Sequence, residues 1–216
     1  MNGVRNTRSG GLFLLATATL VLMSVGGAMA SGGGVGPGGG GGDGGAGCKT
    51  AQFGDRVLER GDCGSDVKTL NWLLRARDYG VELDPRFADQ THASVRDFQR
   101  RRDLSRTGVV NGSTRDALRA AMGSQKASWY GPGFFGNQTA CGQTFTRESQ
   151  GVAHRTLPCG TKLVIAYRGR FVRTRVIDRG PFVKRSRYER DWDLSQALAQ
   201  KLHFDGVDRI RTAPIR

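Results

Sequence analysis

Residues 162–178, KLVIAYRGRFVRTRVID, decide the fold class of the C-terminal half of this chain. The stretch contains two β-rich runs, 162–167 and 171–178, separated by a short Arg-Gly-Arg connection. In the second run Phe and Arg side chains alternate with two valines and a threonine, which predicts a strand with one buried face. The Arg-Gly-Pro sequence at 179–181 then ends that strand.

Downstream, one helix is expected among further strands. Asp193 is placed to cap a helix that carries three leucines on one face, and residues 207–211 predict another strand. A single helix among several strands with glycine-rich crossings predicts a small closed β-barrel over residues 126–216.

Residues 48–123 instead predict a small module of three short helices. Ser65, Asp89 and Ser113 are each placed to cap a helix, and Gly80 is placed to end the first one. The fold class is therefore a two-domain α + β chain, with a three-helix module followed by a small closed barrel. We expect the two domains to fold separately.

The first thirty residues predict a cleaved secretory signal peptide. Arg5 and Arg8 precede an apolar run, and Ala28, Met29 and Ala30 form a small-x-small cleavage site. The apolar run is about 12 residues long, whereas a membrane-spanning helix needs roughly 20. An uncleaved anchor is the alternative, but we expect no stable membrane insertion after cleavage.

Residues 31–47 predict a flexible linker, because 12 of these 17 positions are glycine. Such a segment has almost no side chains to bury in a core.

The charge of the chain points to a polyanionic partner. The formal net charge is +14, and residues 126–216 hold 17 basic and 7 acidic side chains. For an exported bacterial chain the abundant polyanions are cell-wall polymers and not nucleic acid. We therefore expect a secreted, cell-wall-associated protein, with a purely solubilising surface charge as the alternative.

The four cysteines predict two disulfides, since an even count in an exported chain is typical of structural bridges. The simplest pairing is one per domain, Cys48 with Cys63 and Cys141 with Cys159. Each loop corresponds to about 3 kcal/mol in the chain-entropy model. A metal site is the alternative, but the chain has no C-x-x-C pair and its three histidines are scattered. We expect neither metal nor cofactor.

The helical module resembles the peptidoglycan-binding domain type 1 family, in which the motif D-V-x-x-L-Q-x-x-L precedes two further helical motifs. Asn71 stands where that pattern has glutamine, and the glycine usual before Thr91 is absent. The resemblance implies a wall-binding module without catalysis, although the matched apolar residues also suit a plain core. The matching residues are Asp66, Val67, Leu70, Leu73, Thr91, Val95, Phe98, Gln99, Leu104, Gly108, Val110, Thr114 and Leu118.

The barrel half resembles the RlpA-like double-psi β-barrel family in motif order over nearly its whole length. The resemblance implies a six-stranded double-psi barrel whose ligand is the glycan strand of peptidoglycan. Lytic transglycosylases belong to this family, and expansins are similar barrels. The matching motifs are ASWYG at 127–131, TACG at 139–142, AHRTLPCGT at 153–161, VIDRGPF at 176–182 and DLS at 193–195.

One departure from the lytic members concerns catalysis. They carry G-E-x-[FY]-D after the T-A motif, whereas this chain has Gln143 and Thr146 in place of the two acids. An amide cannot protonate a leaving glycosidic oxygen.

The acids that remain are Asp193, the first candidate catalytic acid, and Asp178, the second, with His154 as a possible partner. Their structural alternatives are a helix cap for Asp193, an ion pair of Asp178 with Arg179 or Arg175, and a hydrogen-bonded structural role for His154.

Trp129 and Tyr130 are candidates for sugar contacts, because exposed aromatic rings stack on sugar faces, although Trp129 suits a core equally well. The resemblance places Gln143 and Thr139 on the wall of the same groove. We expect Asp178 and Asp193 to face a common cleft, with His154 and Tyr130 nearby.

Two functions follow. The preferred one is a non-catalytic or weakly active wall binder that loosens glycan strands, and the alternative is a peptidoglycan lytic transglycosylase that uses Asp193 or Asp178. A nucleic-acid binder would rest on charge alone.

Overall fold

The computed structural model describes residues 47–182 and 190–216. Residues Gly44–Arg216 belong to one compact unit. The expected signal peptide at 1–30, and all of the expected linker except Gly47, lie outside the described residues.

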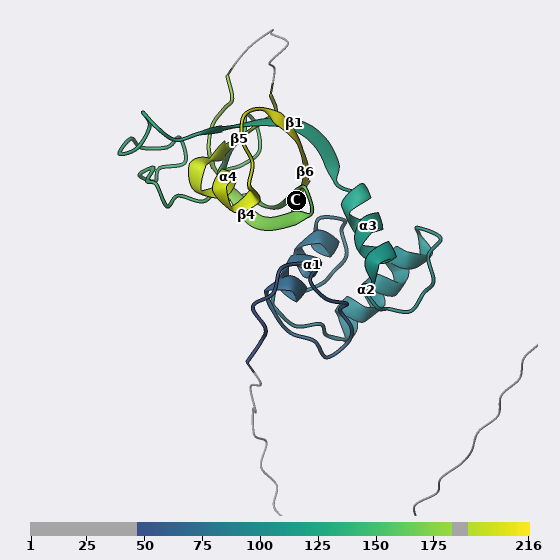
Figure 1. Cartoon of the computed structure of the whole chain (residues 1–216). Coiled ribbons are helices and arrows are strands. Elements are labelled where there is room, and N and C mark those ends of the chain that lie inside the picture. Colours follow the sequence, from purple (N-terminus) through teal and green to yellow (C-terminus); the bar gives the residue numbers. More distant parts are fainter. Residues whose placement is uncertain (1–46, 183–189) are drawn as a thin grey trace, which may run out of the picture. The chain divides into compact units, whose positions relative to one another are not determined.

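Three helices form the first part of this unit, as the sequence predicts (Figure 1). They are α1 (Ser65–Arg75), α2 (Asp89–Arg100) and α3 (Gly112–Ala120).

The helices begin close to the predicted positions, but their caps differ. Gly64 and Ala88 precede α1 and α2 without a side-chain cap, and the side chain of Asn111 accepts a hydrogen bond from the Thr114 N–H at the start of α3. Helix α1 ends at Arg75 and not at Gly80, because the chain already turns at Asp78, which has a positive φ of 63°.

Six strands close into a barrel in the order β1-β5-β2-β4-β3-β6, which confirms the predicted six-stranded barrel (Figure 1). Strand β3 coincides with the predicted run at 162–167. The pairs β1–β5 and β2–β4 are parallel and the other pairs are antiparallel. The strands are β1 (Gly123–Tyr130), β2 (Val152–Ala153), β3 (Lys162–Tyr167), β4 (Arg170–Asp178), β5 (Trp192–Ser195) and β6 (Asp208–Pro214).

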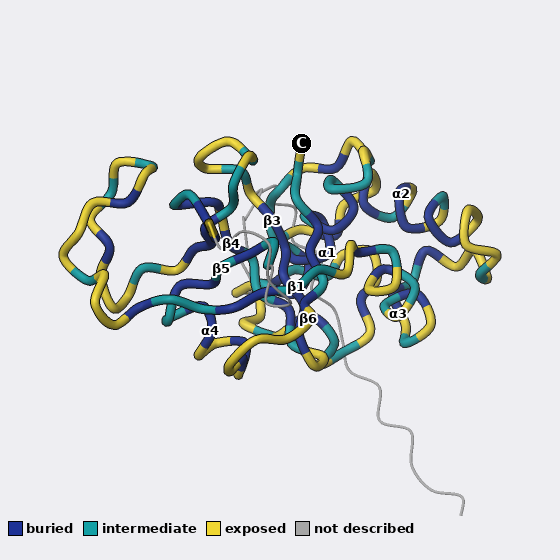
Figure 2. Tube along the Cα trace, turned by 90° about the horizontal axis from the view of Figure 1, so that it is seen from above, coloured by how far each residue is buried: buried dark blue, intermediate teal, exposed yellow. Residues whose placement is uncertain are grey.

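Two apolar clusters hold the unit together, and their buried stretches run through the strands and along α1 in Figure 2. One fills the barrel and includes Ala127, Val152 and Leu194. The other joins helical residues to the outside of β3 and β4, and within it Phe53 and Phe171 meet edge to face with ring centroids 5.0 Å apart. Since helical and barrel residues share this second cluster, separate folding of 48–123 and 126–216 stays a prediction.

The two disulfides pair as predicted. Cys48 bonds to Cys63, and Cys141 bonds to Cys159.

Candidate functional site

Two carboxylates lie in register across the barrel wall. Strand β2 runs between β5 and β4, and its Ala153 pairs with Asp193 on one side and with Asp178 on the other. Neighbouring strands are about 4.8 Å apart, so the Cα atoms of the two aspartates are about 10 Å apart. Strand pairing therefore brings together two acids that are 15 positions apart in the sequence.

A register shift puts Asp178 on the same face as Asp193. Val152 pairs with Val176, but the next residue, Ala153, pairs with Asp178 and skips Ile177. A bulge of this kind redirects the side chain that follows it. Val152 and Val176 belong to the apolar cluster inside the barrel, so the two aspartates lie on the opposite, outer face.

Asp193 is a strand residue and not the predicted helix cap. It lies in β5, and the following helix α4 (Gln196–Leu202) is capped by Ser195, whose side chain accepts from the Leu198 N–H. The Ser128 hydroxyl of β1 donates a hydrogen bond to Asp193. Burial raises the pKa of Asp193 above its ordinary value, while the Ser128 hydrogen bond and the charge of Arg190 act in the opposite direction.

Asp178 is held by backbone groups and not by the arginines considered as alternatives. Its Oδ1 accepts from the N–H of Ala140 and from the N–H of Arg179, both at 2.8 Å. The Arg179 guanidinium instead donates to the carbonyl of Leu157 at 2.9 Å. In the described part of the chain, neither Arg179 nor Arg175 forms an ion pair with Asp178.

Tyr130 contributes a hydroxyl to the same face. It lies at the end of β1, two residues after Ser128, so their side chains share one side of the strand. Burial raises its pKa first, and the charges of Asp178 and Asp193 add to that shift. The hydroxyl oxygen is enclosed and forms no hydrogen bond of normal geometry among the described residues, although Asp178 is near enough to contribute to the pKa shift as a side-chain partner. A neutral donor is therefore available near both acids.

Aromatic packing fixes the Tyr130 ring. Phe145, which is buried, stacks on it at a centroid distance of 4.7 Å, and Phe134 meets its edge at 6.0 Å. Phe134 is 54% exposed and is thus the ring that a sugar could reach from solvent.

Gln143 and Thr139 close a tight turn beside Asp178. The Thr139 N–H donates to the Gln143 carbonyl at 2.8 Å, and the Thr139 hydroxyl accepts from the Gln143 N–H at 3.3 Å. Thr139 is buried and therefore shapes the turn, whereas Gln143 is partly exposed.

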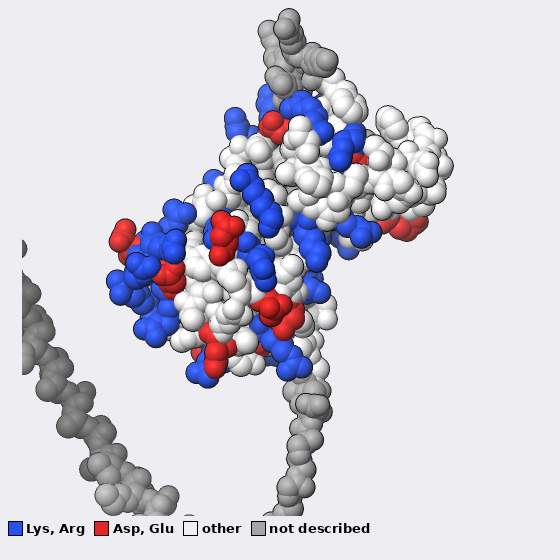
Figure 3. Space-filling view, turned by 180° about the vertical axis from the view of Figure 1, so that it is seen from behind, with Lys and Arg blue, Asp and Glu red and all other residues white. Residues whose placement is uncertain are grey.

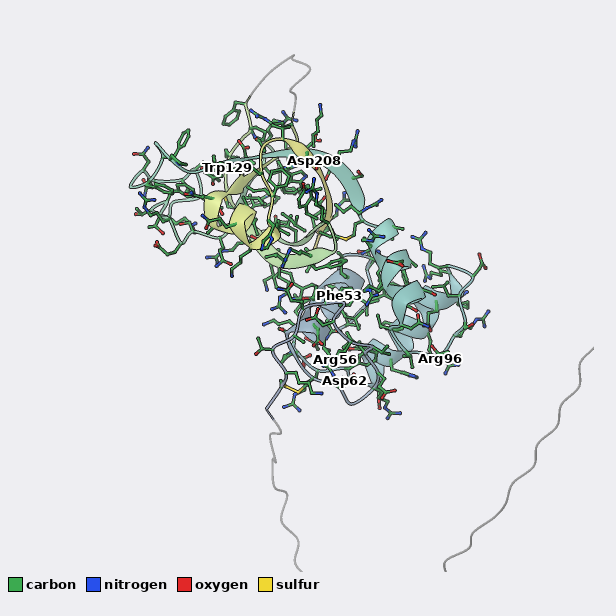
Figure 4. The ribbon with its side chains drawn as sticks, viewed as in Figure 1. Phe53, Arg56, Asp62, Arg96, Trp129 and Asp208 are labelled. Atoms are coloured by element: carbon green, nitrogen blue, oxygen red, sulfur yellow. A yellow bond between two sulfur atoms is a disulfide. The ribbon has the colours of Figure 1, made fainter. Side chains whose placement is uncertain are left out.

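His154 and Trp129 point away from the aspartates. The His154 ring packs against Trp192 with centroids 4.3 Å apart, and its Nδ1 accepts from the N–H groups of Thr156 and Leu157. Burial, followed by the charge of Arg155, lowers the pKa of His154. Trp129 packs against the cluster inside the barrel (Figure 4). The His154 N–H donates to the Asp178 carbonyl at 3.2 Å, but the side chains of His154 and Trp129 do not join those of the two aspartates and Tyr130.

Sequence reasoning missed Ser128 and Ala140. Ser128 could have been found, because it lies two positions before Tyr130 in the ASWYG motif. Ala140 acts through its backbone N–H, which carries no side-chain signal.

One cleft among the described residues, of about 500 Å³, is lined by His154, Trp192 and Gln125 and by none of the three residues of the aspartate face. Residues 47–182 and 190–216 bring no three His, Cys, Asp or Glu side chains together as a metal site. Within the same ranges, no helix is long and apolar enough to cross a membrane. Basic side chains spread widely over the face shown in Figure 3.

Comparison with known proteins assigns both halves of the chain. Residues 122–215 match the family model described as lytic transglycolase, and residues 63–118 match that of a peptidoglycan binding domain.

Individual relatives agree with these matches. The endolytic peptidoglycan transglycosylase RlpA of Campylobacter jejuni is 40% identical over 113 residues, which is 50% of this chain and 38% of that protein. The probable endolytic peptidoglycan transglycosylase RlpA of Aquifex aeolicus is 46% identical over 85 residues, or 38% of this chain and 36% of that protein. This chain thus spans less than two fifths of the length of these curated relatives. Among solved structures, the SleB N-terminal domain is 30% identical at a TM-score of 0.31, covering 32% of this chain and 96% of that chain.

Proposed function

We propose that this chain, which joins a peptidoglycan-binding domain to an RlpA-like double-psi β-barrel, is an exported cell-wall protein whose barrel binds and loosens glycan strands. One observation carries the proposal. Asp178 and Asp193 lie in register on one outer face of the barrel, with the unpartnered Tyr130 hydroxyl near both. A glycan strand offers hydroxyl groups as donors and ring or glycosidic oxygens as acceptors, and these match carboxylate oxygens and a tyrosine O–H.

Each of the three residues has a separate part in binding. Asp178 uses Oδ1 for two backbone N–H groups, which leaves Oδ2 free to accept from a sugar hydroxyl. The raised pKa of Tyr130 keeps its hydroxyl protonated, so that it donates to the sugar. Asp193, partly buried beside Ser128, lies on the same face as Asp178 but across strand β2 from it, and offers a second carboxylate to the glycan.

Loosening without cleavage is the preferred form of this function. The resemblance to lytic members places their acids at the positions of Gln143 and Thr146, and neither side chain here can donate a proton as an acid. Replacing contacts between neighbouring glycan strands needs binding groups only.

A lytic transglycosylase that uses Asp193 is the second candidate, because burial raises the pKa of this group. As an acid, Asp193 would give its proton to the glycosidic oxygen while the C1–O bond breaks. As the resulting base, it would take the proton from the 6-hydroxyl of the same sugar as O6 bonds to C1. The product would be a 1,6-anhydro sugar, and one carboxyl group would suffice for both steps.

Incubation of the chain from residue 31 onward with purified sacculi separates these functions. We expect co-sedimentation that weakens about fivefold in Asp178→Asn, without anhydro-muropeptides in the supernatant by mass spectrometry. Asp205→Asn, which removes an exposed acid of the same barrel, is the matched control and should bind normally.

Two outcomes would change the conclusion. Anhydro-muropeptides that disappear in Asp193→Asn would establish the lytic function. Unchanged binding in both Asp178→Asn and Asp193→Asn would exclude the proposed glycan site. A further variant, Gln143→Glu with Thr146→Asp, should create cleavage if the missing acids are what prevents it.

Anionic wall polymers are a proposed second class of partner. The basic excess of residues 126–216 attracts polyanions over a range of about 8 Å at physiological salt. This part of wall binding should fade as salt rises, whereas the contacts of the aspartate face should persist.

A further inference from the structure

The Cys141–Cys159 disulfide connects two segments, and each of them is hydrogen-bonded either to the side chain of Asp178 or to the strand that carries it. Cys141 lies in the tight turn 139–143, and the neighbouring Ala140 N–H reaches Asp178 Oδ1 at 2.8 Å. On the other side, Gly160 follows Cys159 and donates its N–H to the carbonyl of Val176, at 2.8 Å, in the same strand as Asp178. The disulfide therefore joins the segment that holds the carboxylate to the strand that carries it.

We propose that the Cys141–Cys159 disulfide is a positioning device for Asp178, which holds the Ala140 N–H on one carboxylate oxygen so that the other faces the glycan. The proposal rests on the function proposed for Asp178. Cys141, Cys159 and Ala140 act through Asp178 and are positioning residues.

The turn is the tip of a short hairpin. Within it, the N–H groups of Gly142 and Gln143 donate back to Thr139, and Gln138 pairs with Thr144 beside it. The Ala140 N–H bond to Asp178 and the disulfide then link this tip to the barrel wall. Ala140 and Gly142 are exposed, and Gly142 has a positive φ of 85°. Hydrogen bonds within an exposed turn fix its shape but not its position on the barrel. The disulfide to Cys159 therefore determines where the Ala140 N–H points.

The segment that carries Cys159 is well anchored. The Arg179 guanidinium donates to the Leu157 carbonyl at 2.9 Å, and the Thr161 hydroxyl donates to the Pro158 carbonyl at 2.7 Å. Because the Cys159 end is fixed, the disulfide holds Ala140 at a set position relative to the barrel wall. A charge-assisted N–H bond to a carboxylate is strong enough to orient the side chain once its donor is fixed.

The second disulfide supplies a matched control. Cys48–Cys63 closes a sequence separation of 15 residues and Cys141–Cys159 one of 18. The two loops are of similar length, so the chain-entropy model predicts a similar general destabilisation when either bridge is removed.

The first test is an NMR titration of the chain from residue 31 onward. In the oxidised wild type, the Ala140 amide proton should shift along with the titration of the Asp178 carboxyl carbon. In Cys141→Ala/Cys159→Ala we expect at least half of that amide shift to be lost, while the resonances of buried Val164 stay in place. In Cys48→Ala/Cys63→Ala the Ala140 shift should be unchanged, and in Asp178→Asn it should vanish.

The second test measures binding of purified peptide-free glycan strands through the same barrel resonances. We expect about fivefold weaker binding in Cys141→Ala/Cys159→Ala. Reduction with dithiothreitol should have the same effect, since it transfers two electrons and two protons to the bridge and becomes a cyclic disulfide. Reoxidation should restore binding.

An Ala140 amide that still follows Asp178 in Cys141→Ala/Cys159→Ala would overturn the positioning role. So would unaltered glycan binding in that variant, if Asp178→Asn does weaken binding. If Asp178→Asn leaves binding unchanged, the proposed glycan site fails, and with it the functional half of this inference, whereas the amide titration still decides the structural half.

Discussion

The helical module holds a fully buried aspartate and the barrel a partly buried one, and their surroundings differ in kind. In the module, Asp66 is fully buried, and its two oxygens meet the Arg56 guanidinium at 2.7 and 3.2 Å. Arg56 also binds Asp62 at 2.6 Å, and Figure 4 shows these two residues together. In the barrel, Asp193 receives one hydroxyl hydrogen bond from Ser128 and has no ion pair among the described residues.

The difference separates an acid that the fold explains from one that is a candidate for function. Asp66 gains its charge partner inside the protein, and Arg56 has its pKa raised by that contact. Asp193 is held without full compensation, so burial raises its pKa. A buried acid that the fold leaves under-compensated is a candidate for binding or proton transfer, whereas a buried acid in a complete ion pair is explained by the fold alone.

The largest expected effect is on the free energy of unfolding, when Asp66 and Asp193 are each replaced by asparagine. Asp66→Asn should lower the free energy of unfolding by about 3 kcal/mol, because it leaves Arg56 without its buried partner. Asp193→Asn should change it by at most about 1 kcal/mol, since no cation loses a partner. Urea denaturation of the two variants measures both. Equal losses would show that Asp193 is as structural as Asp66.

The second effect concerns hydroxyl groups. Tyr130→Phe should leave stability within about 0.5 kcal/mol of wild type, because the hydroxyl has no partner to lose. It should weaken glycan binding about fivefold to tenfold, equivalent to about 1–1.4 kcal/mol.

Thr91→Val in the module is the converse control. The Thr91 hydroxyl donates to Asn71 at 3.0 Å inside the core, so its loss should cost about 1 kcal/mol of stability. Barrel binding, followed by the barrel's own resonances, should stay the same. A Tyr130→Phe variant that loses stability but keeps binding would contradict the assignment of Tyr130.

The third effect is a pH dependence. The folded pKa of Asp193 lies above the unfolded value of 3.8, so the folded state binds more protons in the window between them. Its contribution to stability therefore falls as pH rises through that window. Asp193→Asn should gain stability relative to wild type as pH goes from 3 to 7, by at most about 1 kcal/mol after solvent screening. Parallel curves for the two proteins in urea titrations would rule out the raised pKa.

The smallest effect belongs to His154. Its folded pKa lies below the unfolded 6.5, so only the unfolded state takes up a proton as pH falls just below 6.5, and stability declines there. His154→Asn can keep the acceptor for Thr156 and Leu157 and should remove this decline. The difference should be under about 0.5 kcal/mol, because the ring is half exposed. Thermal melts at pH 5 and pH 7.5 measure it, and glycan binding at pH 7.5 should not change.

Local patterns predicted the elements well. Strand β3 lies where the β-rich run at 162–167 predicts it, and both disulfides pair as their export and spacing suggest. These features depend on residues close together in the sequence, where alternation and turn chemistry are informative.

The positions of the site residues depend on strand pairings, which local sequence patterns do not predict. Asp193 and Ser195 are both good helix caps, and only the pairing of Asp193 with β1 and β2 assigns the cap to Ser195. The skipped Ile177 similarly decides where Asp178 points. His154 was expected beside the aspartates because its motif matches the barrel family, but its ring packs against Trp192 and accepts from the Thr156 and Leu157 N–H groups instead.

Alternate residues of β5 face the barrel interior and the outer surface, and this limits which sequence changes the strand can accept. Trp192 and Leu194 fill the interior while Asp193, between them, faces outward. Insertion or deletion of one residue in this strand would exchange the two sets and lose the core and the site together. Descendants of this sequence can therefore alter the chemistry of the face by point substitution within the strands, as at Asp193. Changes of length are confined to connections such as 131–151, so selection acts on the identity of residues in the strands and on the number of residues only between them.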